Sequence, residues 1–178
     1  MKKFTWKEAF IDASKAAQDG IPIYQTFVGY CFCYGKGTKK DLEKSKYWHE
    51  QAANKGELDA IFSLAVMNDQ GLGMQRNAAA AVRLYRKAAM KGHLEAQSNL
   101  AIMLLEGDGI KQDVVAGIQW LRKAARRGDS KAQYNLGRAY VVGEGVRKNK
   151  MHAQKWLIKA ANNGHAQARR LLKSKLGN

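Results

Sequence analysis

The pattern Ala-Ala-x-x-Gly occurs five times in this chain at a constant step of 36 residues, and no other feature constrains the fold as much. The five copies end at Gly20, Gly56, Gly92, Gly128 and Gly164. A second pattern, Gly-x-Gly, keeps the same step and begins at Gly35, Gly71, Gly107 and Gly143. A period of this length, kept without insertions, is typical of stacked supersecondary units. Because one such unit cannot bury its apolar face alone, its neighbours must cover it.

The third repeat shows most clearly what one unit contains. Residues 96–104 carry apolar side chains at helical spacing, which predicts a first helix, called helix A here. Gly107 and Gly109 interrupt it, since glycine adopts positive φ at little cost. Asp113 is a typical N-cap for a second helix, helix B, which ends at a C-terminal glycine. The same N-cap position recurs in the four repeats as Asp41, Asn77, Asp113 and Asn149.

The repeats predict an all-α protein, a right-handed α/α solenoid of about ten helices. We expect one solenoid domain over residues 1–178, with a half-repeat at each end and four full repeats between them. The expected segments are 1–20, 21–56, 57–92, 93–128, 129–164 and 165–178. Thr5 and Glu8 form a capping-box pattern at the start of the first half-repeat, a helix B over residues 5–18. The last half-repeat is expected to be a helix A over residues 166–175.

Large apolar residues recur at fixed positions of the repeat, which indicates a structural core and not a ligand cage. The residues expected in this core are Trp48, Leu64, Leu100, Trp120, Leu136 and Trp156. Small residues recur on helix A, where they would let the two helices of a hairpin approach closely. Glycine at two of these positions costs roughly 1 kcal/mol of helix propensity, so close packing must return more.

The repeat resembles the Sel1-like repeat (SLR), a 36-residue relative of the tetratricopeptide repeat. The clearest copy runs from Ala132-Gln133-Tyr134-Asn135-Leu136-Gly137 to Lys159-Ala160-Ala161-Asn162-Asn163-Gly164. The resemblance implies tetratricopeptide-like helical hairpins over nearly the whole chain. It also implies an adaptor or scaffold of bacterial signalling, envelope biology, host interaction or effector immunity, and a protein without catalytic residues.

In the tetratricopeptide folds that this repeat resembles, helix A lines the concave face of the solenoid. The resemblance therefore implies a partner-binding face on helices A, whose positions vary in chemistry from repeat to repeat. The contact residues expected there are Tyr30, Tyr34, Phe62, Val66, Ile102, Tyr134, Arg138 and Arg170. Aromatic and arginine side chains are frequent binding hot spots. The alternative is that some of these residues, Phe62 and Tyr134 especially, pack between adjacent hairpins.

The formal net charge of +16 favours an anionic partner. Residues 1–89 carry 14 Lys/Arg and 9 Asp/Glu, whereas residues 90–178 carry 17 and 6. We expect an acidic protein or peptide partner. The alternative is binding of nucleic acid or another polyanion through the basic C-terminal half. The candidate patch for it is Arg122, Lys123, Arg126, Arg127, Arg169 and Lys173. This terminal charge is also compatible with a solvated end cap.

No pattern for catalysis, a cofactor or a metal is found in the sequence. The Gly-x-Gly pairs follow helices and not strands, so they are expected to be hairpin turns. Cys31 and Cys33 lie about 200° apart around a helix, which is unfavourable for a disulfide. We expect a monomer without a membrane span. Lys7, Glu8 and Asp12 interrupt any secretory signal, which favours the cytoplasm unless a leader has been removed.

Overall fold

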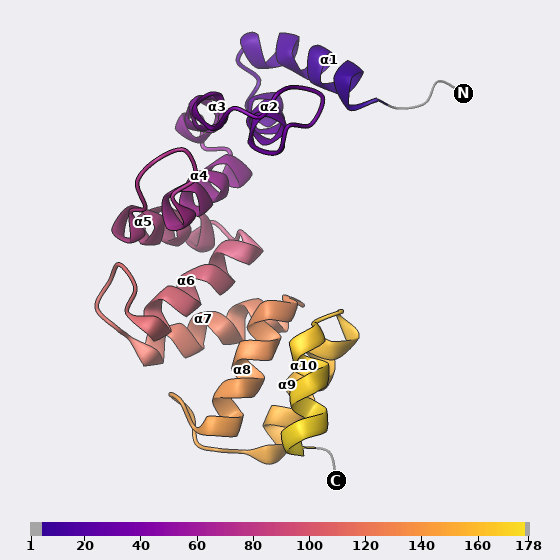
Figure 1. Ribbon diagram of the computed structural model, residues 1–178. Coiled ribbons are helices and arrows are strands. Elements are labelled where there is room, and N and C mark those ends of the chain that lie inside the picture. The colour runs from indigo at the N-terminus through magenta and orange to yellow at the C-terminus, as the bar shows by residue number, and fades with distance from the viewer. Residues whose placement is uncertain (1–4, 177–178) are drawn as a thin grey trace. The chain divides into compact units, whose positions relative to one another are not determined.

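The computed structural model describes residues 5–176, and within them the chain forms ten α helices, α1 to α10, and a short π-helical turn, η1 (Figure 1). No strand occurs in this described range. The helices belong to two compact units, a first unit that ends at Lys91 and a second unit that begins at Gly92. The all-α repeat fold predicted from the sequence is confirmed.

The first unit consists of one helix B followed by two hairpins. Its helices are α1 (Trp6–Gln18), α2 (Pro22–Tyr34), α3 (Leu42–Asn54), α4 (Leu58–Gln70) and α5 (Ala78–Met90). Helix α2 packs against α1 and α3, and α4 packs against α3 and α5. Helices α2 and α4 are therefore the helices A of this unit, and α1, α3 and α5 are its helices B.

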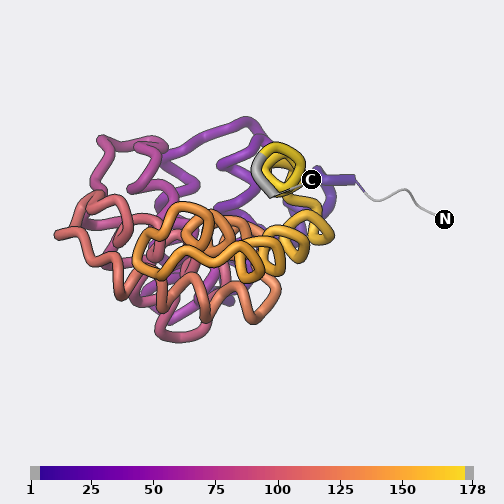
Figure 2. Tube along the Cα trace, turned by 90° about the horizontal axis from the view of Figure 1, so that it is seen from below, coloured from indigo at the N-terminus to yellow at the C-terminus, as the bar shows by residue number. Residues whose placement is uncertain are grey.

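The second unit consists of two hairpins followed by one helix A. Its helices are α6 (Leu94–Glu106), α7 (Val114–Arg126), α8 (Ser130–Val142), α9 (Lys150–Asn162) and α10 (Ala166–Leu171), with η1 at Leu172–Leu176. In the tube of Figure 2, these helices and their short connections can be traced by colour to α10, in yellow near the C-terminus. Helix α8 packs against α7 and α9, and α9 packs against α10. The expected final helix at 166–175 is thus an α helix only to Leu171 and changes there to a π turn.

The helices B begin at the predicted caps. Asp41, Asn77, Asp113 and Asn149 each precede a helix B and accept a hydrogen bond from the backbone N–H three residues later. At the first helix, Thr5 Oγ1 accepts from the N–H of Glu8 at 3.2 Å and donates to the Glu8 carboxylate at 2.7 Å. These bonds satisfy amides that have no partner inside the helix.

The helices A carry a second set of caps, which also connect successive repeats. Glu57 Oε2 accepts from the N–H of Ala60 at 2.7 Å and from the hydroxyl of Thr26, one repeat earlier, at 2.8 Å. In the second unit, Asp129 Oδ1 accepts from the hydroxyl of Ser98 at 2.5 Å as well as from its own helix. The cap carboxylate therefore fixes the start of one helix A against the preceding helix A.

Neighbouring repeats are also connected by hydrogen bonds to the carbonyls of the glycines that end the Ala-Ala-x-x-Gly pattern. Arg127 Nη1 donates to the carbonyl of Gly92 at 2.7 Å, and Asn163 Nδ2 donates to the carbonyl of Gly128 at 3.2 Å. Lys55 donates in the same way to the carbonyl of Gly20. Each donor lies 35 residues after its acceptor, so each bond joins equivalent turns of neighbouring repeats.

The core of each unit lies between its helices A and B. Leu64, Leu100 and Leu136 are buried, in line with their expected place in the core. Apart from Ala16, the alanines of the Ala-Ala-x-x-Gly pattern are buried where helix B meets its neighbours, for example Ala124 and Ala125. Small helix-A residues allow close approach: a Cβ on Gly137 would lie 2.7 Å from Cγ of Leu157, closer than real side chains come.

The tryptophans expected in the core pack against it without being enclosed by it. Trp48, Trp120 and Trp156 are only half-buried. The fully buried position of helix B is the next residue, which is His49, Tyr85, Leu121 and Leu157 in the four repeats. One residue is a rotation of about 100° around a helix. This rotation turns Trp156 towards the core cluster of the preceding hairpin and leaves part of its ring in water.

Candidate functional site

A pocket of about 220 Å³ lies on the helix-A side of the first unit, between α2 and α4. It brings together four expected contact residues, Tyr30 and Tyr34 from α2 and Phe62 and Val66 from α4. The ring centroids of Tyr30 and Tyr34 are 4.7 Å apart. The rest of its lining is Cys33, His49, Ser63, Met67 and Leu72. We call this site the aromatic pocket.

His49 of α3 gives the aromatic pocket a buried polar wall. Its side chain is 3% exposed, and its Nδ1 has no hydrogen-bond partner among the described residues. Burial lowers the pKa of His49 to about 4, although the nearby Glu57 carboxylate acts in the opposite direction. The imidazole is therefore neutral at pH 7. Sequence analysis did not single out His49 because the equivalent residues, Tyr85, Leu121 and Leu157, share no chemistry with it.

A second pocket, of about 460 Å³, lies on the helix-A side of the second unit and is lined by residues of α6, α8 and α10 and of the connections next to α8 and α10. It contains three expected contact residues, Ile102, Tyr134 and Arg138. The other residues of its lining are Leu105, Glu106, Lys131, Asn135, Glu144, His165 and Gln167. We call this site the polar pocket, because charged side chains of both signs line it.

The charges of the polar pocket are partly paired. Arg138 Nη2 lies 4.0 Å from Glu144 Oε2, and both side chains are well exposed. Lys131 Nζ donates to Asn99 Oδ1 at 2.9 Å. Because the Arg138–Glu144 ion pair is long and solvated, it contributes little stability and leaves the guanidinium accessible to an incoming carboxylate.

Tyr134 both lines a pocket and packs against a residue of the next repeat. Its ring lines the polar pocket and also stacks on the imidazole of His165, with centroids 4.4 Å apart and planes 15° from parallel. Burial lowers the pKa of His165, against the opposing effect of Asp129. Phe62 behaves alike in the aromatic pocket, since its ring packs 5.9 Å from that of Tyr85 on α5. Tyr134 and Phe62 therefore each line a pocket and also pack against a neighbouring aromatic ring.

Arg170 is the one expected contact residue outside both pockets. It is exposed on α10 but does not line the polar pocket. Thr26 and Ser98, at the equivalent position of earlier helices A, donate to the inter-repeat caps Glu57 and Asp129. In both units, a residue at this position of the repeat thus makes a contact between neighbouring repeats.

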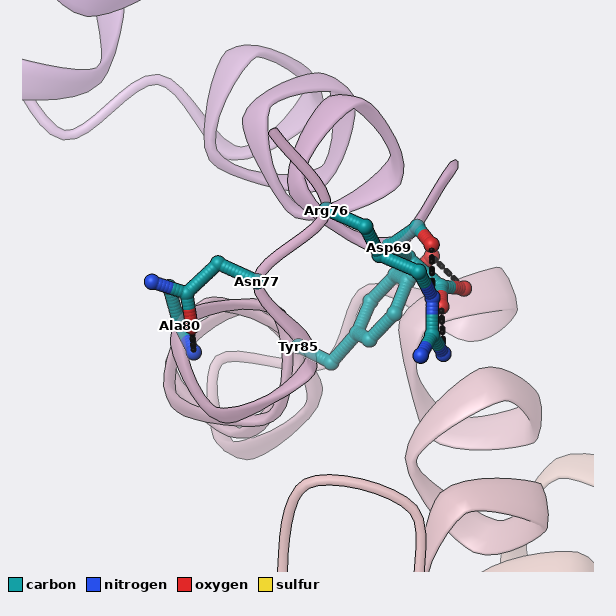
Figure 3. A network of polar contacts seen from close by, with 5 residues as sticks. All are labelled: Asp69, Arg76, Asn77, Ala80 and Tyr85. Atoms are coloured by element: carbon teal, nitrogen blue, oxygen red, sulfur yellow. Dashed lines mark hydrogen bonds and ion pairs between the residues drawn. The ribbon is translucent and has the colours of Figure 1, made fainter. Parts of the chain in front are cut away.

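Asp69 of α4 also has a structural role, which Figure 3 shows. Arg76 Nε donates to the Asp69 carbonyl at 2.7 Å, and Arg76 Nη2 lies 3.3 Å from Asp69 Oδ1. The hydroxyl of Tyr85 donates to Asp69 Oδ2 at 3.3 Å. Directly after Arg76, Asn77 Oδ1 accepts from the N–H of Ala80 at 2.9 Å at the start of α5. The network fixes the connection between α4 and α5.

The structure divides the six cations of the expected basic patch. Arg127 and Arg169 bind backbone carbonyls at helix ends, those of Gly92 and Ala161. Lys123 Nζ lies 4.9 Å from the ring centroid of Trp120, and Lys173 is exposed in η1. Arg122 and Arg126 line one cavity together. The six cations of the expected patch therefore differ in their contacts.

No group of three or more His, Cys, Asp or Glu side chains in residues 5–176 is placed to hold a metal ion. Within the same residues, no helix has both the length and the apolar character needed to cross a membrane.

The Sel1 repeat family model matches residues 22–57, 58–93, 94–129 and 130–165, which is most of the chain. The chain belongs to the Sel1 repeat family. Proteins of this family are generally protein-interaction scaffolds built on a non-catalytic repeat fold. The human protein sel-1 homolog 2 is 37% identical over 73 residues, which cover 40% of this chain. That match covers only 11% of the human protein's length.

Solved structures of Sel1 repeat proteins are similar to this one. A Sel1 repeat protein from Oxalobacter formigenes is 31% identical with a TM-score of 0.90, over 97% of this chain and 70% of that one. A protective antigen with an SLR fold, c5321 of uropathogenic Escherichia coli, is 33% identical with a TM-score of 0.86, over 94% of this chain and 37% of that one. The immunity protein Pa5087 from Pseudomonas aeruginosa is 19% identical with a TM-score of 0.65, over 99% of this chain and 67% of that one, and shares the fold alone.

Proposed function

We propose that this Sel1 repeat protein is a non-catalytic binding module that holds a partner protein through the helix-A pockets of its two units. The observation that supports the proposal is the position of the expected contact residues. Seven of the eight line either the aromatic pocket or the polar pocket, although they come from four different helices. These residues differ from repeat to repeat, as a surface that recognises a non-repetitive partner requires.

The aromatic pocket is suited to an apolar side chain of the partner. Tyr34 is 61% exposed and Tyr30 is 40% exposed, so both rings offer large apolar faces to a bound segment. Tyrosine is a frequent hot spot because it provides much contact area at small conformational cost. The volume of about 220 Å³ fits one large side chain, with the imidazole of His49 as the polar group at the wall.

The polar pocket is suited to an acidic segment of the partner. Arg138 and Lys131 provide two cationic groups beside the apolar surface of Ile102 and Tyr134. Arginine binds carboxylates through two parallel hydrogen bonds when the geometry allows it. Glu106 and Glu144 line the same pocket and would repel a carboxylate of the partner in other parts of it. We therefore expect that carboxylate to bind beside the guanidinium of Arg138. The net charge of +16 adds a long-range attraction for acidic partners.

Capture from a lysate of the source cells tests the proposal. The wild-type chain, Arg138→Glu and a control, Arg83→Glu, are immobilised in equal amounts, and retained proteins are identified by mass spectrometry. Arg83 is exposed on helix B of the first unit, so its reversal changes the net charge equally without touching a helix-A pocket. We expect one protein that the wild type and Arg83→Glu retain and Arg138→Glu loses. Equal retention by all three chains would exclude Arg138 from the binding site.

A catalytic function is not part of the proposal. Cys33 and Ser63 line the aromatic pocket together with His49, but the Nδ1 of this imidazole has no hydrogen-bond partner among the described residues, and Ser63 donates to the carbonyl of Asp59 instead. A cysteine nucleophile needs such a base within hydrogen-bond reach. The aromatic pocket is therefore better suited to binding than to chemistry.

A further inference from the structure

A different surface of the second unit gathers cations on helices B. Two cavities of about 430 and 460 Å³ share Arg122 of α7, Tyr140 of α8 and His152 of α9. Their cationic lining consists of Arg122, Arg126, Arg147, Lys148, Lys155 and Lys159. No carboxylate lines either cavity in the described part of the chain. We call this surface the basic surface.

The charges of the basic surface are not compensated. None of its six cations forms an ion pair with a carboxylate in residues 5–176. Glu144, the last acidic residue of the sequence, lies in the connection between α8 and α9, close in sequence to Arg147 and Lys148. Its carboxylate pairs with Arg138 and lines the polar pocket instead. The positive potential of the basic surface is thus available to an anionic ligand.

Aromatic rings lie among these cations. The rings of Tyr140 and His152 are in contact, with centroids 5.1 Å apart. Trp156 lines the same cavity as Arg122 and Arg126, and Lys159 Nζ lies 5.2 Å from its ring centroid. Cations that alternate with aromatic rings are the pattern of surfaces that bind single-stranded nucleic acid, where phosphates meet the cations and bases meet the rings.

The repeat itself does not require this charge. The positions 72 residues earlier, on α3, α5 and the connection between α4 and α5, hold Glu50, Asn54, Gln75, Arg76, Arg83 and Lys87. An acid thus stands where the basic surface has Arg122, and a neutral amide where it has Arg126. In addition, Arg76 is engaged by Asp69. Three of the six cations, Arg122, Arg126 and Arg147, therefore have no cationic equivalent 72 residues earlier, whereas Lys148, Lys155 and Lys159 do.

We propose that the basic surface binds single-stranded nucleic acid, independently of the protein partner held on the helix-A side. The guanidinium groups of Arg122 and Arg126 match phosphate oxygens in geometry and charge. Phosphates along the strand are held by these groups and by Lys155 and Lys159, while a base is placed against the rings of His152 and Trp156. The site takes a short stretch of strand, since two cavities span only a part of one unit.

Fluorescence anisotropy with labelled oligo(dT) and oligo(rU) of about a dozen nucleotides tests the proposal across a salt series. The decisive variant is Lys155→Gln with Lys159→Gln. Its matched control is Arg83→Gln with Lys87→Gln, which removes the same charge from equivalent exposed positions of α5. Loss of two phosphate contacts lowers the slope of log K against log salt by about 1.4, because each contributes about 0.7 on single strands. We expect this change in the first variant and an unchanged slope in the control.

A second variant, Arg122→Gln with Arg147→Gln, leaves the Lys159–Trp156 contact in place, and we expect it to weaken binding in the same way. Circular dichroism verifies that each variant is folded. The proposal is overturned if the wild type binds neither oligonucleotide at low salt, or if the control weakens binding as much as the Lys155/Lys159 variant. It is also overturned if poly-glutamate displaces the strand at equal charge concentration, because the surface would then select an acidic polypeptide. Binding of a protein partner on the helix-A side affects none of these outcomes.

Discussion

The imidazole of His49 lies so close to Gly29 that a Cβ on this glycine would be 2.8 Å from Cε1 of the ring. This contact joins α2 to α3 in the first hairpin and forms the base of the aromatic pocket. The last full hairpin has the same arrangement, in which Gly137 of α8 faces Leu157 of α9. In these two hairpins the glycine on helix A makes room for the facing side chain on helix B, which would collide with a methyl group there.

Stability is expected to fall on mild acidification because of His49. The pKa of His49 is lowered from 6.5 to about 4 in the folded chain. Between these two values the unfolded chain binds more protons than the folded one, so stability falls as the pH decreases and is fully present above pH 6.5. The shift corresponds to about 3 kcal/mol over the whole interval. Urea unfolding at a series of pH values, for the wild type and His49→Leu, measures it.

His49→Leu places in the first hairpin the residue found in the last two full repeats. We expect the variant to gain about 1 kcal/mol at pH 7, because the unpartnered Nδ1 is removed. Its stability is also expected to change less with pH than that of the wild type. Parallel pH profiles for the two chains would show that another group causes the acid sensitivity.

Gly29→Ala is expected to destabilise the first hairpin. The new methyl group displaces the imidazole of His49, and overpacking of this kind typically costs about 1–3 kcal/mol. Alanine returns about 1 kcal/mol through helix propensity, so the net loss is smaller than the steric cost. Combination with His49→Ala makes room for the methyl group, and the double variant should show a favourable coupling energy in a thermodynamic cycle. Additive effects would contradict the contact.

The neighbouring residues Trp120 and Leu121 are expected to differ in a way that the sequence does not predict. Leu121 is 0% exposed, so Leu121→Ala should cost about 2–5 kcal/mol. Trp120 is half-buried and partly covered by Lys123, so Trp120→Ala should cost less than the 3–5 kcal/mol that is typical of an enclosed tryptophan, by about a third. Chemical denaturation monitored by circular dichroism compares the two variants. If Trp120→Ala lost more unfolding free energy than Leu121→Ala, the tryptophan would be the more important core residue, contrary to this prediction.

Tyr85→Phe tests the network around Asp69 in Figure 3. The variant removes the hydroxyl that donates to Asp69 Oδ2 and keeps the buried ring. We expect a loss of about 1.5 kcal/mol, since hydrogen bonds to charged groups contribute more than neutral ones. In Asp69→Asn the same replacement should have a smaller effect. An equal loss in both backgrounds would show that the hydroxyl acts through another contact.

The periodic parts of the sequence predicted the fold because each repeat uses the same residue type for the same task. Asp41, Asn77, Asp113 and Asn149 all cap a helix B, and this signal survives in every copy. His49 and the inter-repeat caps are different, since their positions hold unlike residues in each repeat. Which side of helix B faces the core is decided by packing and not by the period. For this reason the sequence did not show that Leu121 is more deeply buried than its neighbour Trp120.

The candidate binding residues were predicted through the resemblance to tetratricopeptide folds, and their grouping came from the structure. Tyr34 and Phe62 lie 28 positions apart in the sequence but line one pocket. Arg170 belongs to the same helix position as Phe62, yet α10 does not bring it into the polar pocket. Some basic residues bind backbone carbonyls, as Arg127 and Arg169 do, while others remain available to a ligand. Because these side chains are long, the sequence does not predict which of them reach a carbonyl.

The affinity of the captured partner for Tyr34→Ala, compared with Tyr47→Ala, tests the central claim most directly. Tyr34 is 61% exposed in the aromatic pocket, whereas Tyr47 is 53% exposed on helix B of the same hairpin. Neither replacement should change the unfolding midpoint, because both rings are largely in water. Titration calorimetry should show a loss of at least about tenfold for Tyr34→Ala, the effect of a binding hot spot, and no change for Tyr47→Ala. Unchanged affinity in Tyr34→Ala, or an equal loss in both, would contradict binding through the helix-A pockets.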